Sequence, residues 1–145
     1  MQTLAQLALA IDQDAVPKAL EWLDATGRQA GWPPRTLFKL RLCLDETLTN
    51  ITLYSHAGAP PDGDPPLVEL VIRQHEETLI LEICDNGVPF DPTAQTPRDL
   101  DTSLDDARIG GHGLRLMHHY LDDLTYERRD GWNCLSLVAR LDSSP

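Results

Sequence analysis

One helical period constrains the fold more than any other feature of this 145-residue sequence. From Pro34 or Arg35 to about Tyr54, apolar side chains recur at steps of three and four residues, which predicts one amphipathic helix with a single buried face. The positions of this apolar stripe are Leu37, Leu40, Leu44, Leu48 and Ile51. A helix of this kind needs a second layer of structure to cover its apolar face.

Shorter segments on both sides of this helix predict that the second layer is a sheet. Apolar runs between turn residues predict five strands, and capping and helical spacing predict two further helices. The predicted strands cover residues 4–11, 67–73, 79–84, 124–128 and 132–141, and the predicted helices cover residues 16–29 and 114–121. The order of these elements predicts an α+β fold: a two-layer α/β sandwich with a mixed, mostly antiparallel sheet and helices on one face.

Length and charge narrow the classes of function. A chain of this length fits one domain over residues 1–145, without room for a second core. Its 12 basic and 23 acidic residues give a net charge of −11. Such a surface repels nucleic acid and anionic membranes, so we expect neither as a direct partner. It can still bind a nucleotide where backbone N–H groups, a metal ion or a helix N-terminus balances the phosphate charge.

The N-terminal segment and the cysteines predict the compartment. The first residues lack a basic region and an extended apolar stretch, so no signal peptide is expected, and no apolar run has the length of a membrane span. Cys43, Cys84 and Cys134 are odd in number, far apart and without C-x-x-C spacing, which indicates neither a disulfide framework nor a zinc site. We therefore expect a reducing, cytoplasmic environment.

Two polar residues beside the apolar stripe are candidates for chemistry. Glu46 and Asn50 are four residues apart, so their side chains lie on one helix face, one turn apart. An amide oxygen can ligate Mg²⁺, and a carboxylate can accept a proton or orient water. The alternative is that both belong to a solvated helix face.

The turn after the predicted hairpin offers a second candidate. A carboxylate at Asp85, at the end of a core strand, is costly to bury unless a partner such as a purine amino group pairs with it. Gly87 would let a base approach the backbone closely. The alternative is an Asp-Asn-Gly turn selected for its backbone angles alone.

A glycine cluster forms the third candidate. Residues 110–113 (GGHG) precede a predicted helix and expose successive backbone N–H groups at its positive end, an arrangement that suits phosphate. A flexible hinge explains the cluster equally well. The cluster is not a P-loop, because no lysine follows it.

In this order, the three segments resemble the motifs of the GHKL ATPase superfamily, and most closely those of the bacterial anti-sigma-factor serine kinases. Residues 44–50 (LDETLTN) resemble the N box, residues 85–92 (DNGVPFDP) the first glycine box, and residues 110–117 (GGHGLRLM) the second glycine box. The resemblance covers about residues 4–141. It implies the Bergerat-type ATP-binding fold, ATP and Mg²⁺ as cofactors, and an ATP lid over about residues 93–109.

The resemblance also implies residue roles. Glu46 is the expected general base, Asn50 the expected Mg²⁺ ligand, and Asp85 the expected partner of the adenine amino group, with Gly87 beside the ring. The residues expected to hold the phosphates are Arg108, Gly110, Gly111, His112, Gly113 and Leu114. Arg115 also flanks the second glycine box, and the sequence does not select between it and Arg108.

Three functions fit these features. The first is an anti-sigma factor and serine kinase that phosphorylates a STAS-type anti-anti-sigma protein, in relatives that are commonly homodimers. The second is a nucleotide-dependent switch that sequesters a partner without phosphorylating it; such a switch would not need Glu46. The third, the catalytic domain of a histidine kinase, is disfavoured, because the chain has no helix pair carrying a phospho-accepting histidine.

Overall fold

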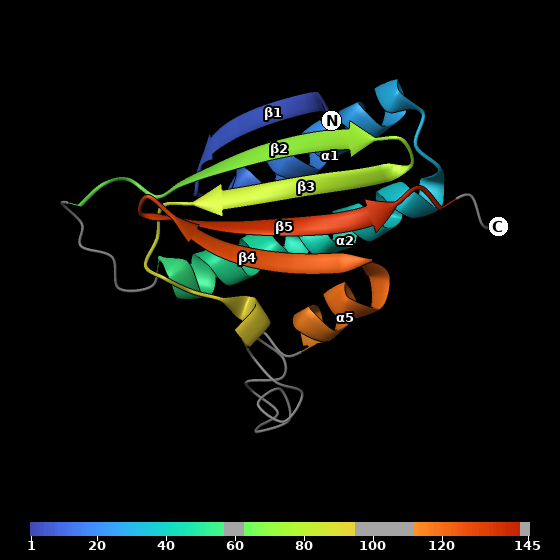
Figure 1. The fold of residues 1–145 in the computed structure, drawn as a ribbon. Helices are drawn as coiled ribbons and strands as arrows, with labels where there is room; N and C mark the ends of the chain where they lie inside the picture. The colour runs from blue at the N-terminus through green and yellow to red at the C-terminus, as the bar shows by residue number, and fades with distance from the viewer. Residues whose placement is uncertain (57–62, 95–111, 143–145) are drawn as a thin grey trace.

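The computed structural model describes residues 1–56, 63–94 and 112–142, which form one sheet with helices on one face (Figure 1). The strands lie in the order β1-β2-β3-β5-β4. They are β1 (Gln2–Ala10), β2 (Leu67–His75), β3 (Thr78–Asp85), β4 (Asp123–Arg129) and β5 (Trp132–Arg140). The helices are α1 (Ala15–Ala30), α2 (Pro34–Asn50) with the π-helical turn η1 (Ile51–Ser55), the short 3₁₀-helix η2 (Pro92–Ala94), and α5 (His112–Tyr120). The predicted α+β two-layer sandwich is confirmed.

The sheet differs from the prediction in one respect. All four pairings among the described strands are antiparallel, so the expectation of a mixed sheet was wrong for this part of the chain. The cause is the connectivity: β2–β3 and β4–β5 are hairpins, and the chain returns after α2 and after α5 in the direction that pairs antiparallel with its neighbour. The strand β1 lies at an edge of the sheet, as expected.

Both hairpins turn in two residues. Asp130 and Gly131 have φ values of 50° and 84°, and two left-handed residues in succession match the right-handed twist of the flanking strands. In the β2–β3 hairpin His75 pairs with Thr78, so the turn is Glu76-Glu77 and both strands are longer than predicted. Asp85 is therefore the last residue of β3 instead of the first residue of a loop.

The core lies between α1, α2 and the inner face of the sheet. Alternate residues of β3 are buried, as a strand with one covered face requires. Among the largest fully buried side chains of this core are Leu23 of α1, Leu40 and Leu44 of α2, Leu70 and Ile72 of β2, Leu79 and Leu81 of β3, and Leu137 of β5. The predicted stripe of α2 is confirmed except at Leu37, which is only partly buried, and it also includes Cys43 and Thr47.

The Cys43 thiol titrates far above its ordinary range. Burial is the main cause, the charge of Glu46 adds to it, and together they raise the pKa of this thiol to about 12.

A disulfide joins two neighbouring strands, contrary to the prediction from the cysteine spacing. Cys84 and Cys134 are directly paired in the β3–β5 register, with 4.1 Å between their Cα atoms, and the structure joins them. The expectation of no disulfide was therefore wrong for this pair. Their sequence separation of 50 residues gave no sign of it, because only the register of two strands brings them together.

The observed ends of α2 and α5 show where the predicted motifs lie in the fold. α2 and η1 run without interruption to Ser55, close to the predicted end at Tyr54. The helix α5 begins at His112, so His112 and Gly113 lie in its first turn and not in the loop that was predicted there. Arg108, Gly110, Gly111 and the predicted lid beyond Ala94 lie outside the described residues. Among the helices that the structure describes, none is long and apolar enough to cross a membrane.

Candidate functional site

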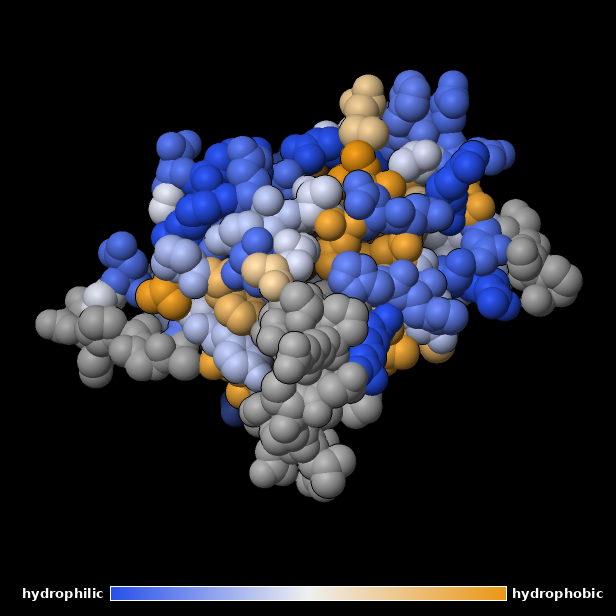
Figure 2. All heavy atoms as spheres, turned by 60° about the horizontal axis from the view of Figure 1, so that its bottom comes forward, coloured by the Kyte–Doolittle hydropathy of each residue, from blue (hydrophilic) through white to orange (hydrophobic). Residues whose placement is uncertain are grey.

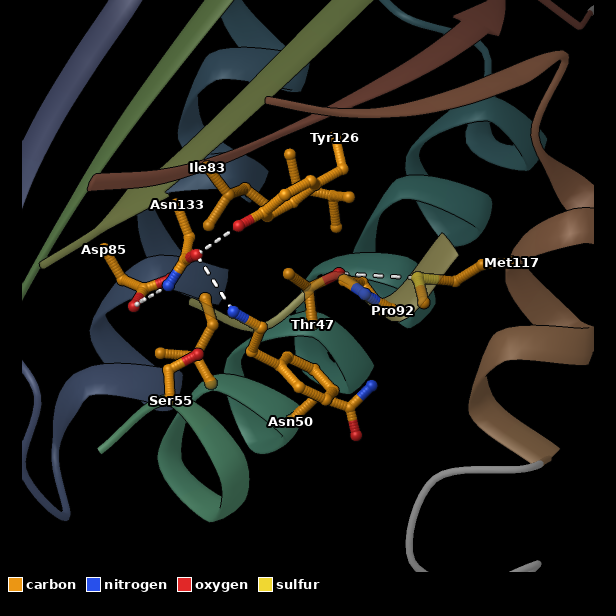
Figure 3. A pocket seen from close by; sticks show the side chains of 12 residues that line it. Thr47, Asn50, Ser55, Ile83, Asp85, Pro92, Met117, Tyr126 and Asn133 are labelled. Carbon is orange, nitrogen blue, oxygen red and sulfur yellow. Dashed lines mark hydrogen bonds between the residues drawn. The ribbon is translucent and has the colours of Figure 1, made fainter. Parts of the chain in front are cut away.

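A narrow slot opens between the C-terminal end of α2, the turn η1 and the ends of β3 and β5 (Figure 3). Its exposed surface is mainly apolar, although half of the residues that line it are polar. The polar residues that line it are Thr47, Asn50, Ser55, Asp85, Tyr126 and Asn133. Its volume is about 20 Å³, close to the smallest space that holds one water molecule. A purine can therefore enter only when lining side chains move.

Two of the predicted site residues meet in this slot. Asn50 comes from the end of α2 and Asp85 from the end of β3, 35 residues apart along the chain, and both line the same hollow. Glu46 and Gly87 are not among the lining residues. The structure thus brings together the predicted metal ligand and the predicted base-binding carboxylate, and it places the predicted general base just outside.

The carboxylate of Asp85 is buried and oriented. Its residue is 2% exposed, and Oδ1 accepts hydrogen bonds from the Gly87 backbone N–H at 3.0 Å and from Asn133 Nδ2 at 3.2 Å. Among the described residues, the hydrogen bonds to this carboxylate all end on Oδ1. Oδ2 is left to a ligand that donates, such as the exocyclic amino group of adenine.

Asn133 links Asp85 to the loop after β3 and to β4 through hydrogen bonds, and no sequence motif predicted this residue. Its Nδ2 donates to Asp85 Oδ1 and, at 2.8 Å, to the carbonyl of Val88; its Oδ1 accepts from the Tyr126 hydroxyl at 2.5 Å and from the Phe90 backbone N–H at 3.1 Å (Figure 3). All four bonding positions of the amide are used. The sequence signal was a polar residue at an inward position of a strand whose next inward residues are apolar.

Three buried polar atoms in this region have no hydrogen-bond partner among the described residues: Asn50 Oδ1, Ser55 Oγ and His56 Nε2. His56 Nε2 is 3.3 Å from Asp85 Oδ1, but not in a hydrogen-bonding direction. A buried polar atom without a partner costs about 1–3 kcal/mol. These atoms therefore favour a polar ligand or ion beside Asp85.

The Asn50 oxygen fits the requirement for Mg²⁺. Asn50 is 5% exposed, and its Oδ1 is one of the unpartnered oxygens. Mg²⁺ prefers oxygen ligands and usually takes only one or two from protein, with phosphates and water completing the shell. When bound beside a nucleotide, Mg²⁺ neutralises phosphate charge.

Glu46 is partly buried on the face of α2, one turn before Asn50. Desolvation by burial is the main cause that raises the pKa of its carboxyl above the ordinary value of 4.5, and the neighbouring charge of Asp45 adds to the effect. A carboxylate with a raised pKa is a stronger base, which suits proton abstraction near neutral pH.

Gly87 has a structural reason that is separate from its predicted role beside the base, which stays a prediction. A Cβ atom at this position would lie 2.3 Å from the Ser55 carbonyl oxygen, and the next backbone N–H, of Val88, donates to that oxygen at 2.9 Å. The glycine therefore lets the loop after β3 pack on the end of η1. The stacked rings of Tyr54 and Phe90, with centroids 5.0 Å apart, hold the same two segments together.

Substitution of Gly87 by Ala is expected to destabilise the fold by about 1–3 kcal/mol, because the clash is with backbone that a side-chain rotation cannot relieve. It should also weaken nucleotide binding, since the loop carries the partners of Asp85 and Asn133. Urea denaturation and calorimetric titration with ATP measure the two effects. The exposed neighbour provides the control: Val88→Ala should change neither appreciably. A fully stable, ATP-binding Gly87→Ala protein would contradict this account of the loop.

The helix α5 completes the neighbourhood of the slot. Its buried residue Met117 lines the slot, and the Thr47 hydroxyl of α2 donates to the Met117 sulfur at 3.4 Å. Arg115 lies on the exposed side of the same helix. Of the predicted phosphate-binding residues, the structure places the backbone of His112, Gly113 and Leu114 in the first turn of α5.

Comparison with known protein families matches residues 9–139 to the histidine kinase-like ATPase domain. The chain belongs to this family. Two relatives with similar sequences show which branch of the family this histidine kinase-like ATPase domain belongs to. The serine/threonine-protein kinase BtrW of Bordetella bronchiseptica is 44% identical over 92% of this chain and 91% of its own. The serine-protein kinase RsbW of Listeria monocytogenes is 27% identical over 70% of this chain and 65% of its own. Within the family, the domain belongs to the branch of these protein kinases.

A solved structure supports the fold of this histidine kinase-like ATPase domain. The SiaB–SiaC complex of Pseudomonas aeruginosa contains a chain that superimposes with a TM-score of 0.66, covering 95% of this chain and 89% of that one. The two sequences are only 13% identical. The likeness therefore concerns the fold and not the chemistry.

Proposed function

We propose that this protein kinase binds Mg·ATP in the slot and transfers the γ-phosphate to a serine of a STAS-type anti-anti-sigma protein. In the same proposal it is an anti-sigma factor, which the unphosphorylated STAS protein displaces from its sigma factor. The observation that carries the proposal is the placement of Asn50 and Asp85 on the walls of one slot, each with an oxygen available to a ligand. The 44% identity to a serine/threonine-protein kinase supports it.

The proposed role of each residue follows from its position in the site. Asp85, at the end of β3, is proposed to bind the adenine amino group, and Asn50 to hold Mg²⁺ at the phosphates. Glu46, one helical turn farther toward the start of α2, is proposed to accept the proton of the attacking serine hydroxyl. Phosphoryl transfer depends mainly on positioning and charge stabilisation. The backbone N–H groups at the start of α5, with Arg108 or Arg115, are proposed to hold the phosphates.

The alternative is a nucleotide-dependent switch that sequesters its partner without phosphoryl transfer. Such a protein needs the slot but has no use for a base. The raised pKa of Glu46, on the same helix face as Asn50, favours the kinase.

The proposed compartment is the cytoplasm, which supplies ATP. Disulfides such as Cys84–Cys134 are rare in a reducing cytoplasm, so alkylation of free thiols in intact cells would test this proposal.

The deciding experiment is incubation of the purified protein with Mg²⁺, γ-labelled ATP and a STAS-domain protein encoded in the same genome. We expect label on one serine of the STAS protein, and none after that serine is changed to alanine. ATP binding without transfer to any STAS protein of that genome would overturn the kinase proposal and support the switch.

A further inference from the structure

A second hollow lies at the other end of α2, between the start of that helix and the end of α5. Its volume is about 470 Å³, far larger than that of the slot. The residues that line it are Pro34, Arg35, Phe38, Lys39 and Tyr120, and we call it the α2–α5 groove. Figure 2 brings the bottom of Figure 1 forward, and on this side hydrophobic residues lie among hydrophilic ones.

The groove presents aromatic surface to solvent. Phe38 is 56% exposed, and its ring meets Tyr120 edge to face with 6.2 Å between the centroids. Packing against Tyr120 fixes the Phe38 ring without covering it. Preordered, exposed aromatic side chains are typical of the residues that contribute most to protein–protein binding.

The groove is also locally cationic in a chain of net charge −11. Arg35 Nε and Lys39 Nζ lie 3.2 Å and 2.5 Å from the same oxygen, Asp142 Oδ2, so two cations face one carboxylate. The Arg35 side chain is 51% exposed and can donate to a second carboxylate, supplied by a partner. An acidic residue on a partner therefore complements this site.

The groove and the proposed general base share one face of α2. Arg35, Phe38 or Lys39, Leu42 and Glu46 follow one another at steps of three and four residues, which places them in a row along the helix. With a rise of about 1.5 Å per residue, the Phe38 and Glu46 positions are about 12 Å apart. A folded partner that presents a hydroxyl to Glu46 and lies along this row reaches the groove.

We propose that the α2–α5 groove is the docking site of the phospho-acceptor protein. An apolar side chain of that protein enters beside Phe38 and Tyr120, about 12 Å along the helix from the serine that approaches Glu46, and an adjacent acidic side chain pairs with Arg35. This inference rests on the proposed function, because it assigns the substrate contact of the same kinase. It predicts that specificity for the partner lies at this groove and not in the slot.

The test uses the STAS-domain protein with its acceptor serine changed to alanine, so that it binds without reacting. We expect Phe38→Ala and Arg35→Glu each to weaken its binding by about tenfold or more in calorimetric titration, while ATP affinity stays the same. Exposed residues elsewhere provide the matched controls: Leu67→Ala and Arg28→Glu should leave both affinities unchanged. Changing one acidic residue of the partner to lysine should restore binding to the Arg35→Glu protein.

Each outcome decides a separate point. Unchanged partner affinity in Phe38→Ala and Arg35→Glu overturns the docking proposal, as does a wild-type protein that does not bind the partner. Wild-type binding that is weakened by both variants, but without phosphoryl transfer to the native partner, overturns the proposed function and leaves the docking site standing. If sedimentation shows that Phe38→Ala instead converts a dimer to a monomer, the groove joins two copies of this chain and the docking proposal is wrong.

Discussion

Changing Asp85 to Asn is expected to weaken ATP binding by about 100-fold, which corresponds to about 3 kcal/mol, while leaving the fold intact. The substitution keeps the size of the side chain. It also keeps an oxygen in the place of Oδ1, which can still accept from the Gly87 backbone N–H and from Asn133 Nδ2. What changes is the atom in the place of Oδ2, which becomes an NH₂ group.

The loss follows from the chemistry of the ligand. The amino group of adenine is a donor, so it faces another donor in the Asp85→Asn protein instead of a charged acceptor. Guanine has a carbonyl at the same position. We therefore expect the ratio of GTP to ATP affinity to rise in the variant even if both affinities are low.

Calorimetric titration with Mg·ATP and Mg·GTP measures both effects, and circular dichroism checks the fold. Asp91→Asn is the matched control, because Asp91 lies on the same loop, accepts from the Thr93 backbone N–H at 2.8 Å and does not line the slot. We expect it to change ATP affinity by less than about threefold. If Asp85→Asn and Asp91→Asn bind ATP equally well, Asp85 does not contact the base.

The sequence predicted what depends on local pattern. The stripe on α2 fixed which side of that helix faces the sheet, and with it the neighbouring positions of Glu46 and Asn50. The Asp130-Gly131 dipeptide predicted its hairpin because its conformation is set within the turn. That Asn50 and Asp85 line the same slot could be expected only through the resemblance to a family, since nothing in the local sequence joins a helix end to a strand end.

What the sequence did not predict depends on strand register. Asn133 contacts Asp85, and Cys134 contacts Cys84, only because β5 pairs with β3 in one particular alignment. A one-residue shift would turn Asn133 away from the slot. The reason for Gly87 was missed for a similar cause, because its close neighbour is the backbone of Ser55, which belongs to another element.

The small volume of the slot could not be predicted from the sequence either. Apolar walls, which include Phe90, leave a volume of about 20 Å³, although polar side chains suited to a nucleotide also line the slot. A purine can therefore enter only when side chains that line the slot move, and Phe90 and Pro92 of the loop after β3 are among them.

Changing Glu46 to Gln is expected to lower the rate of serine phosphorylation by about 10²- to 10⁴-fold, the usual contribution of a general base, without weakening ATP binding. Gln has nearly the same size but cannot accept the serine proton. Single-turnover transfer from labelled ATP measures the rate, and titration with ATP measures the affinity. Transfer at the wild-type rate would show that Glu46 is not the base and that positioning alone drives the reaction.

The pH dependence of the wild-type rate gives an independent test of the same role. A base acts only when deprotonated, so the rate should fall as the pH falls through the pKa of Glu46, at a pH above the ordinary 4.5 because burial and Asp45 both raise this pKa. Asp45→Asn removes one of these causes and lowers the pKa of Glu46. The acidic limb of the profile should then move to lower pH, while the rate at neutral pH is retained. An acidic limb that stays in place in Asp45→Asn belongs to another group, and in that case the loss in Glu46→Gln would reflect positioning and not proton transfer.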